Sequence, residues 1–294
     1  MPASVPAANE PPTEPGEWQL EALRGEIDRL DEALHNVLIE RSEVVARLAR
    51  LRLKTGAALR PGREAEIIRR RLARHRGPLQ KTTIVQIWRE LLAGTTAMQG
   101  AFSIAVCETD AAGGYAALAR EHFGVLTPLR IHRSPARTIA ELAAGAAVAT
   151  LPFPAEGDPV GAWWQTLGGH ESPRAHVVAL LPFWAPRPEG ARPLSALVLS
   201  SSPPDPSGND RSLLGLAFPP EQSRTRLVGA LTAAGFVPGK LLIERDRAAG
   251  LARALAEVAG FVSDEDPRLS QLDLLAEPAA VLGAYAIPET PAPP

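Results

Sequence analysis

A run of 38 residues, 18–55, contains no proline, and Gly25 is its only glycine. Such a run predicts one unusually long helix, which Gly56 ends. Apolar side chains recur along it at spacings of three and four, namely Leu20, Leu23, Ile27, Leu30, Leu34 and Val37, then Val44, Leu48 and Leu51. This heptad-like seam needs partner helices to cover it.

Two shorter helices are predicted after the first. One lies within 61–78, between a Pro-Gly and a Gly-Pro pair, and the other runs from 82 or 83 to about 99. Before the first helix, residues 1–16 contain five prolines and little that could be buried. We expect them to form a disordered leader.

Short apolar runs and helical patterns alternate beyond residue 100, as is typical of α/β units. A proline-rich passage, 182–193, precedes a last region in which LLGLAF and KLLIERD resemble strands, and RTRLVGALTAAGF and GLARALAEVAG resemble helices. This last region fits a small α+β sandwich. We therefore expect a multidomain chain, with a disordered leader over 1–16, an all-α three-helix domain over 17–100, an α/β region over 101–193, an α+β domain over 194–288 and a disordered tail over 289–294.

Charge and composition narrow the function. Residues 18–99 carry 16 lysines and arginines against 10 aspartates and glutamates, whereas the rest of the chain carries 15 against 23. A basic helical domain favours an anionic partner, whether nucleic acid, anionic lipid or a small acid. No apolar run is as long as a membrane span and the first residues lack a secretory pattern, so we expect a cytoplasmic protein with no membrane partner. The single Cys107 cannot form an internal disulfide, and no structural metal is expected beside it.

An arginine interrupts the apolar seam of the long helix. The next seam position between Val37 and Val44 is occupied by Arg41. Because an unpaired guanidinium is costly to bury, a negative group must meet it, either a protein carboxylate or a ligand. Arg52 lies eleven residues further on, within about 20° of the same direction. Two cations on one helix face favour a dianion.

Other polar residues lie near this seam or on the two shorter helices. Arg24 points about 100° away from Arg41, so we expect it to serve the site of a second chain. Arg63 and Glu64 begin the second helix, where Glu64 either meets the interior or is an ordinary first-turn carboxylate favoured by the helix dipole. In the third helix Thr95 lies one turn before Gln99, and both can donate hydrogen bonds. The apolar stripe of that helix is formed by Ile84, Trp88, Leu91, Thr95 and Met98.

Three segments match the motifs of a known family in order and spacing. They are LEALRGEIDRLDEALHNVLIERSEVVARLARLR, RPGREAEIIRRRLA and IWRELLAGTTAMQG. Residues 18–99 thus resemble the all-helical (type II) chorismate mutases. The resemblance implies an intertwined homodimer of three-helix chains. It also implies an isomerase that converts chorismate to prephenate in aromatic amino-acid biosynthesis, on the shikimate pathway, with no cofactor or metal.

The resemblance assigns roles to the charged residues. Arg41, together with Arg24 of the partner subunit, would bind the substrate carboxylates, and Arg63 and Thr95 would assist around the ring carboxylate. Glu64 would accept a hydrogen bond from the substrate hydroxyl.

The ether oxygen, whose bond breaks, would be contacted by Gln99 and by the residue in place of the family's lysine. That residue is Arg52, or Lys54 two positions later. An aspartate of the family is replaced here by Arg60.

The distal part of the chain carries a second likeness. SIAVCETDAAGGYAALAREHFG and RTIAELAAGAAVATLPF resemble the first lobe of prephenate dehydratases, and SLLGLAF through LIERD to AVLGAYAIP resembles their ACT domain. The Thr-Arg-Phe motif of the dehydratases is missing, and PLSALVLSS occupies its place. We therefore expect a chorismate mutase with a non-catalytic C-terminal half.

Two alternatives stay open. One is a bifunctional chorismate mutase/prephenate dehydratase. The other is a non-catalytic protein whose basic bundle binds nucleic acid or protein while the distal half senses an amino acid. Nucleic-acid binding would need exposed arginines, and the seam position of Arg41 opposes it.

Overall fold

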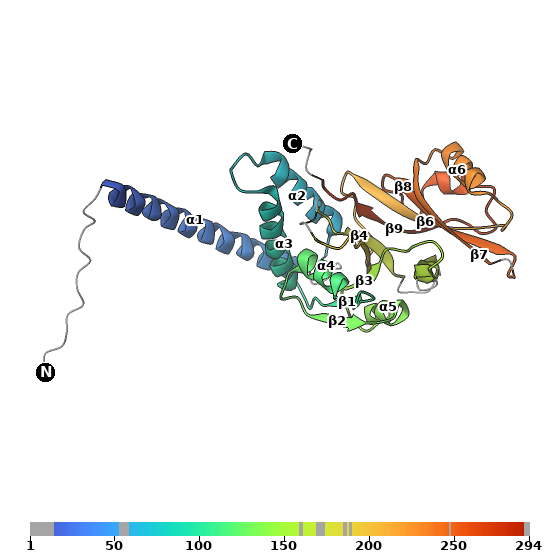
Figure 1. The fold of residues 1–294 in the computed structure, drawn as a ribbon, viewed down its shortest axis with the longest axis horizontal. Coiled ribbons are helices and arrows are strands. Elements are labelled where there is room, and N and C mark those ends of the chain that lie inside the picture. Colours follow the sequence, from blue (N-terminus) through green and yellow to red (C-terminus); the bar gives the residue numbers. More distant parts are fainter. Residues whose placement is uncertain are drawn as a thin grey trace. The chain divides into compact units, whose positions relative to one another are not determined.

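The computed structural model describes residues 15–52, 59–158, 161–168, 174–184, 187, 190–246 and 248–290 (Figure 1). The chain forms two compact units, Met1–Lys54 and Thr55–Pro294, and each is described by itself. Most of the leader expected over 1–16 and the end of the tail expected over 289–294 lie outside the described residues.

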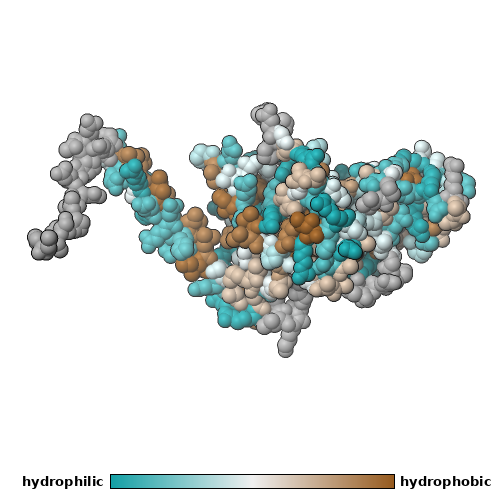
Figure 2. Space-filling model, turned by 60° about the horizontal axis from the view of Figure 1, so that its bottom comes forward, coloured by the Kyte–Doolittle hydropathy of each residue, from teal (hydrophilic) through white to brown (hydrophobic). Residues whose placement is uncertain are grey.

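The first unit contains one long helix, α1 (Pro15–Arg52), which confirms the prediction from the proline-free run. Proline is tolerated at the first turn, so the helix begins three residues before Trp18. The seam side chains Leu20, Leu23, Ile27, Leu30, Leu34 and Val37 are 49% to 59% exposed. Figure 2 shows apolar side chains on the surface of this helix. An apolar stripe of this length marks an interaction surface.

The second unit begins with two helices, α2 (Pro61–Arg74) and α3 (Lys81–Ala97). One face of α2 buries Ala65, Ile68 and Leu72, at the spacing of an amphipathic helix. They share a core with α3 and with the aromatic residues Phe183 and Trp184. This core joins the two helices to the rest of the unit.

The buried face of α3 differs from the predicted stripe. Ile84, Trp88 and Leu91 are only half-buried, and Met98 is exposed. The buried residues of α3 are Val85, Arg89, Leu92, Thr95 and Thr96. The face that packs inward is thus rotated by about one residue, because α2, Phe183 and Trp184 contact that side.

A sheet of nine strands forms the rest of the described part of this unit, in the order β2-β1-β3-β5-β4-β9-β6-β8-β7. The strands are β1 (Ile104–Cys107), β2 (Leu129–His132), β3 (Val148–Pro152), β4 (His176–Leu181), β5 (Ala196–Ser200), β6 (Asp210–Phe218), β7 (Pro238–Asp246), β8 (Leu251–Ala259) and β9 (Ala280–Ala286). The helices around the sheet are α4 (Gly114–Phe123), α5 (Pro135–Ala143), α6 (Arg224–Ala233) and the 3-10 helices η1 (Gly161–Gly168) and η2 (Pro267–Gln271).

The first half of the sheet is mixed. β1 pairs in parallel with β2 and β3, and β5 pairs antiparallel with β3 and β4. Alternate residues of β1 face opposite sides. Ile104 and Val106 pack with α4, whereas Ala105 and Cys107 pack with α5, so the two helices cover opposite faces. Cys107 is buried and free.

The second half is antiparallel, with β6 between β8 and β9 and β7 at the edge. The chain order β6-α6-β7-β8-η2-β9 gives the α+β region that the sequence predicted. α6 covers one face, and Trp163 and Trp164 of η1 pack on the other. The domain boundaries of the preceding subsection stay predictions.

The two halves join where β4 pairs in parallel with β9, at Val177 and Gly283. Gly283 has φ +133°, and a Cβ there would lie 2.1 Å from the carbonyl oxygen of Val177. Only glycine allows this close approach of the two backbones.

The prediction of a helix over GLARALAEVAG is wrong, because this segment forms β8. Its small residues Ala252, Ala254 and Ala256 and the branched Val258 are fully buried at a period of two. They face α6, and the strand pairs on both sides with β6 and β7. Pairing with two neighbouring strands outweighs the local helix preference of alanine, leucine and arginine.

Candidate functional site

Three of the cationic residues predicted for the site, Arg24, Arg41 and Arg52, lie on α1. The side chain of Arg24 is 63% exposed and pairs with Glu21, one turn away, at 3.6 Å. Arg41 lies seventeen residues further along the same helix, and Arg52 is its last residue. The side chain of Arg52, and all of Lys54, lie outside the described residues.

Glu64, the carboxylate predicted near the beginning of α2, lies in the interior. Of the two interpretations of this residue, an interior carboxylate and an ordinary first-turn carboxylate, the first is therefore correct. Only 9% of Glu64 is exposed, and its Oε2 lies 3.2 Å from Nη1 of Arg89 on α3. Arg89 is itself 4% exposed, and its guanidinium carbon lies 4.6 Å from the ring centre of Phe183. A buried carboxylate of this kind needs such a partner, because an unpaired buried charge is costly.

Burial shifts the pKa of both members of this pair. Loss of hydration raises the pKa of Glu64, the charge of Arg89 lowers it, and the nearby carboxylate of Asp205 raises it again. Burial lowers the pKa of Arg89 to about 10, and Glu64 opposes that shift. The net result is a carboxyl group with a raised pKa beside a cation that stays protonated at neutral pH.

The first turn of α2 is held from elsewhere in the unit. The backbone N–H groups of Gly62 and Arg63 donate to the two carboxylate oxygens of Asp205, at 3.0 and 3.1 Å. Arg60, which replaces the family's aspartate, pairs with the same carboxylate at 3.3 Å. The side chain of Arg63 is half exposed and pairs with Glu66 at 2.6 Å.

The remaining two predicted residues lie at the end of α3. The hydroxyl of Thr95 is directed along its own helix, where it donates to the carbonyls of Leu91 and Leu92 at 2.9 and 3.0 Å. The amide nitrogen of Gln99 donates to the carbonyl of Thr95 at 3.0 Å. The buried oxygen of the Gln99 amide has no hydrogen-bond partner among the described residues. The Thr95 hydroxyl and the Gln99 amide are thus two polar groups one helical turn apart at the C-terminal end of α3.

Sequence reasoning missed two residues of this region, Arg89 and Asp205. Arg89 lies on the same helix face as Val85, Leu92 and Thr96, which are buried. It is therefore a cation within an apolar face that needs a negative partner, as was argued for Arg41. Asp205 has no such signal, because it lies 143 residues from Gly62 and meets α2 only in the folded unit.

Among the described residues no group of three or more His, Cys, Asp and Glu side chains could hold a metal ion. In the same part of the chain no helix is both long and apolar enough to cross a membrane. What the helices offer is guanidinium, amide and hydroxyl donors, which can bind carboxylates and stabilise negative charge as it develops.

Residues 23–100 match the family model described as chorismate mutase type II. The protein therefore contains a chorismate mutase type II domain, a domain of a family of isomerases. The mixed α/β sheet follows this domain, which confirms the multidomain fold class.

The chain is similar to the bifunctional chorismate mutase/prephenate dehydratase of Pseudomonas aeruginosa, with 32% identity over 120 residues. That match covers 38% of this chain and 33% of the relative, so the chain spans about a third of the curated protein. Among solved structures it is similar to GqqA, described as a novel type of quorum quenching acylase, with TM-score 0.46, 16% identity, and coverage of 62% of this chain and 94% of that one. It is also similar to the prephenate dehydratase from Streptococcus mutans, with TM-score 0.45, 13% identity, and coverage of 63% and 98%.

Proposed function

We propose that this protein is a chorismate mutase that converts chorismate to prephenate in the cytoplasm, in aromatic amino-acid biosynthesis. The observation that carries the proposal is the family match over 23–100, which spans most of α1 and all of α2 and α3. The whole C-terminal half is proposed to be non-catalytic. The strand and helix order of 194–288 supports an ACT-like domain there.

The rearrangement is pericyclic and requires neither a nucleophile nor a metal. The protein has to hold the substrate in a compact conformer and stabilise the charge that separates between the ether oxygen and the ring. Arg41, together with Arg24 of the partner subunit, would hold the two carboxylates, since guanidinium groups bind carboxylates through two parallel hydrogen bonds. Arg63 would assist around the ring carboxylate. Arg52 and Gln99 would donate to the ether oxygen.

Glu64 would accept a hydrogen bond from the substrate hydroxyl. This role needs the ionised carboxylate, whose pKa is raised by burial. The charge of Arg89 at 3.2 Å favours the ionised form and thus supports the role. Thr95 would assist at the ring carboxylate by turning its hydroxyl away from the backbone carbonyls of its own helix.

A homodimer is part of the proposal. The apolar seam of α1 is about half exposed, and a second copy of the same helix is a partner of matching length and pattern. Arg24 of the partner subunit would then complete the site, because it faces away from Arg41 on its own helix. Light scattering of the purified chain would test the dimer.

One assay tests the function. The purified protein is incubated with chorismate, and both the loss of chorismate and the appearance of prephenate are followed. Prephenate without phenylpyruvate supports the proposal. Unchanged chorismate would refute it and would leave a non-catalytic binding protein.

The same assay decides on a second activity. The curated relative is named a bifunctional chorismate mutase/prephenate dehydratase, which favours a search for dehydratase activity here. The absence of the Thr-Arg-Phe motif opposes it. Formation of phenylpyruvate from prephenate would show that the distal half is catalytic.

A further inference from the structure

Helix α2 begins without a cap of its own. Its N-cap residue, Arg60, makes no side-chain hydrogen bond to the first turn, and an arginine has no acceptor to offer. Pro61 has no N–H, so the donors left open in the first turn are those of Gly62 and Arg63. Both are bound by Asp205, which lies on the segment between β5 and β6.

The contact is close and depends on a glycine. A Cβ at Gly62 would lie 2.2 Å from the carbonyl oxygen of Asp205, so a side chain at that position would push the segment away. The carboxylate of Asp205 is 16% exposed and also pairs with Arg60. A buried negative charge at a helix N-terminus is favoured by both the open N–H groups and the helix dipole.

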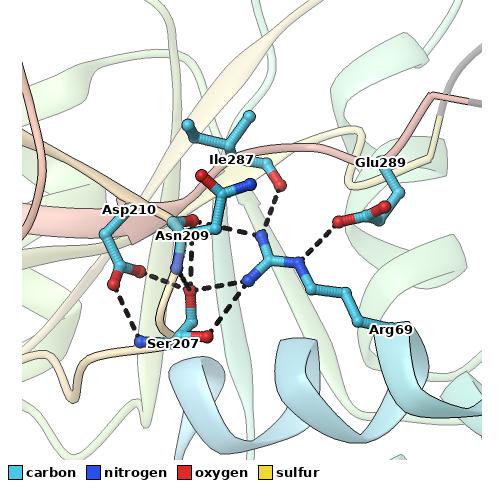
Figure 3. A network of polar contacts seen from close by, with 6 residues as sticks. All are labelled: Arg69, Ser207, Asn209, Asp210, Ile287 and Glu289. Carbon is cyan, nitrogen blue, oxygen red and sulfur yellow. Dashed lines mark hydrogen bonds and ion pairs between the residues drawn. The ribbon is translucent and has the colours of Figure 1, made fainter.

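A second anchor lies two turns further along the same face of α2. Arg69 follows Gly62 by seven residues, which returns it to within about 20° of the same direction. Its guanidinium donates to the carbonyls of Ser207, Asn209 and Ile287, to the Ser207 hydroxyl and to the carboxylate of Glu289, as Figure 3 shows. The sheet half of the unit therefore holds α2 at two points on one face.

We propose that Asp205 is a positioning residue for the mutase site, because it fixes the turn of α2 that carries Arg63 and Glu64. The inference rests on the proposed function. Asp205 acts through the backbone of α2 and through its charge, since the charged groups that face Glu64 are Arg89 and Asp205. The distal half of the chain then supports catalysis without taking part in the chemistry.

The variant Asp205→Asn tests this role. It keeps one acceptor oxygen but loses the charge and the second acceptor. We expect the amide hydrogens of Gly62 and Arg63 to exchange about tenfold faster. We also expect kcat with chorismate to fall by about tenfold or more, because small misplacements of substrate-binding groups are costly.

The pH profile separates positioning from a loss of folding. Without the charge of Asp205 the pKa of Glu64 falls, so the acid limb of the kcat profile moves to lower pH. Asp205→Glu keeps the charge, and its acid limb should stay at the wild-type position. The exposed Asp273→Asn variant, which loses one carboxylate elsewhere, should leave exchange, kcat and the pH profile unchanged.

The outcomes distinguish the two proposals. An active wild-type protein whose Asp205→Asn variant keeps the wild-type kcat, acid limb and amide exchange would overturn the role of Asp205 alone. A wild-type protein that consumes no chorismate would overturn the proposed function, and with it this role of Asp205.

Discussion

Arg69 links α2 to the segments around the ends of β6 and β9, and its removal should destabilise the second unit. The side chain is 18% exposed and makes five hydrogen bonds. Three of them are to backbone carbonyls, at 3.2, 3.1 and 2.8 Å. Arg69→Met keeps most of the aliphatic stem and leaves these acceptors without their donor.

The size of the effect follows from these contacts. A net contribution of about 1 kcal/mol for each bond gives an upper value near ~5 kcal/mol. Water reaches the exposed fifth of the side chain and replaces some of the lost bonds, so we expect a loss of about 3 kcal/mol in the free energy of unfolding. For a unit of this size that loss lowers Tm by roughly 6–12 °C.

Urea unfolding and differential scanning calorimetry of the full chain measure the loss. The matched control is Arg70→Met, because the side chain of Arg70 is 55% exposed and its ion pair with Glu66 spans 3.7 Å. The control should unfold at the wild-type midpoint. A change below about 1 kcal/mol for Arg69→Met would refute the argument that this network holds α2 to the sheet.

Three further predictions test the join, a buried histidine and the proposed site. Gly283→Ala should lower the free energy of unfolding by at least about 3 kcal/mol, because the new Cβ is strained and clashes with the backbone of Val177. The control Gly229→Ala on α6, where open space surrounds the glycine, should raise the free energy of unfolding by roughly 0.5–1 kcal/mol. Equal effects of the two variants would contradict the close approach of β4 and β9. Burial, and then the charge of Arg89, lowers the pKa of His122 well below its usual value, so its contribution to stability is complete above about pH 6.5 and is lost as pH falls below that value. His122→Leu should flatten the decline of stability with acid by up to about 1.4 kcal/mol per pH unit, as measured by urea unfolding across pH; a wild-type slope in this variant would count against a neutral buried imidazole. Arg41→Ala should reduce chorismate turnover by at least about a thousandfold, and near-normal prephenate formation would refute the site.

Much of the helical part could be predicted from the sequence, because its signals are local. The run without proline and with a single glycine predicts most of α1, and the Pro-Gly pair at 61 and 62 marks the beginning of α2. For Glu64 the local pattern left two interpretations open, the interior and an ordinary first-turn carboxylate, and its burial shows that the first is correct. The roles of Arg24, Arg41 and Gln99 in catalysis stay predictions.

The sequence missed features that depend on distant partners. β8 has the composition of a helix, and it becomes a strand because β6 and β7 supply hydrogen bonds on both sides. The true inward face of α3 follows from contacts with Phe183 and Trp184, which lie about ninety residues further along the chain.

By itself, the sequence determined that α1 is one long helix, with its apolar seam and the arginines set along it, since these depend on residues within a few turns of one another. Only the tertiary structure decided that Arg89 neutralises Glu64 and that Asp205 completes the first turn of α2. Buried charges and open helix N–H groups must find partners, and nothing in the local sequence specifies where those partners come from.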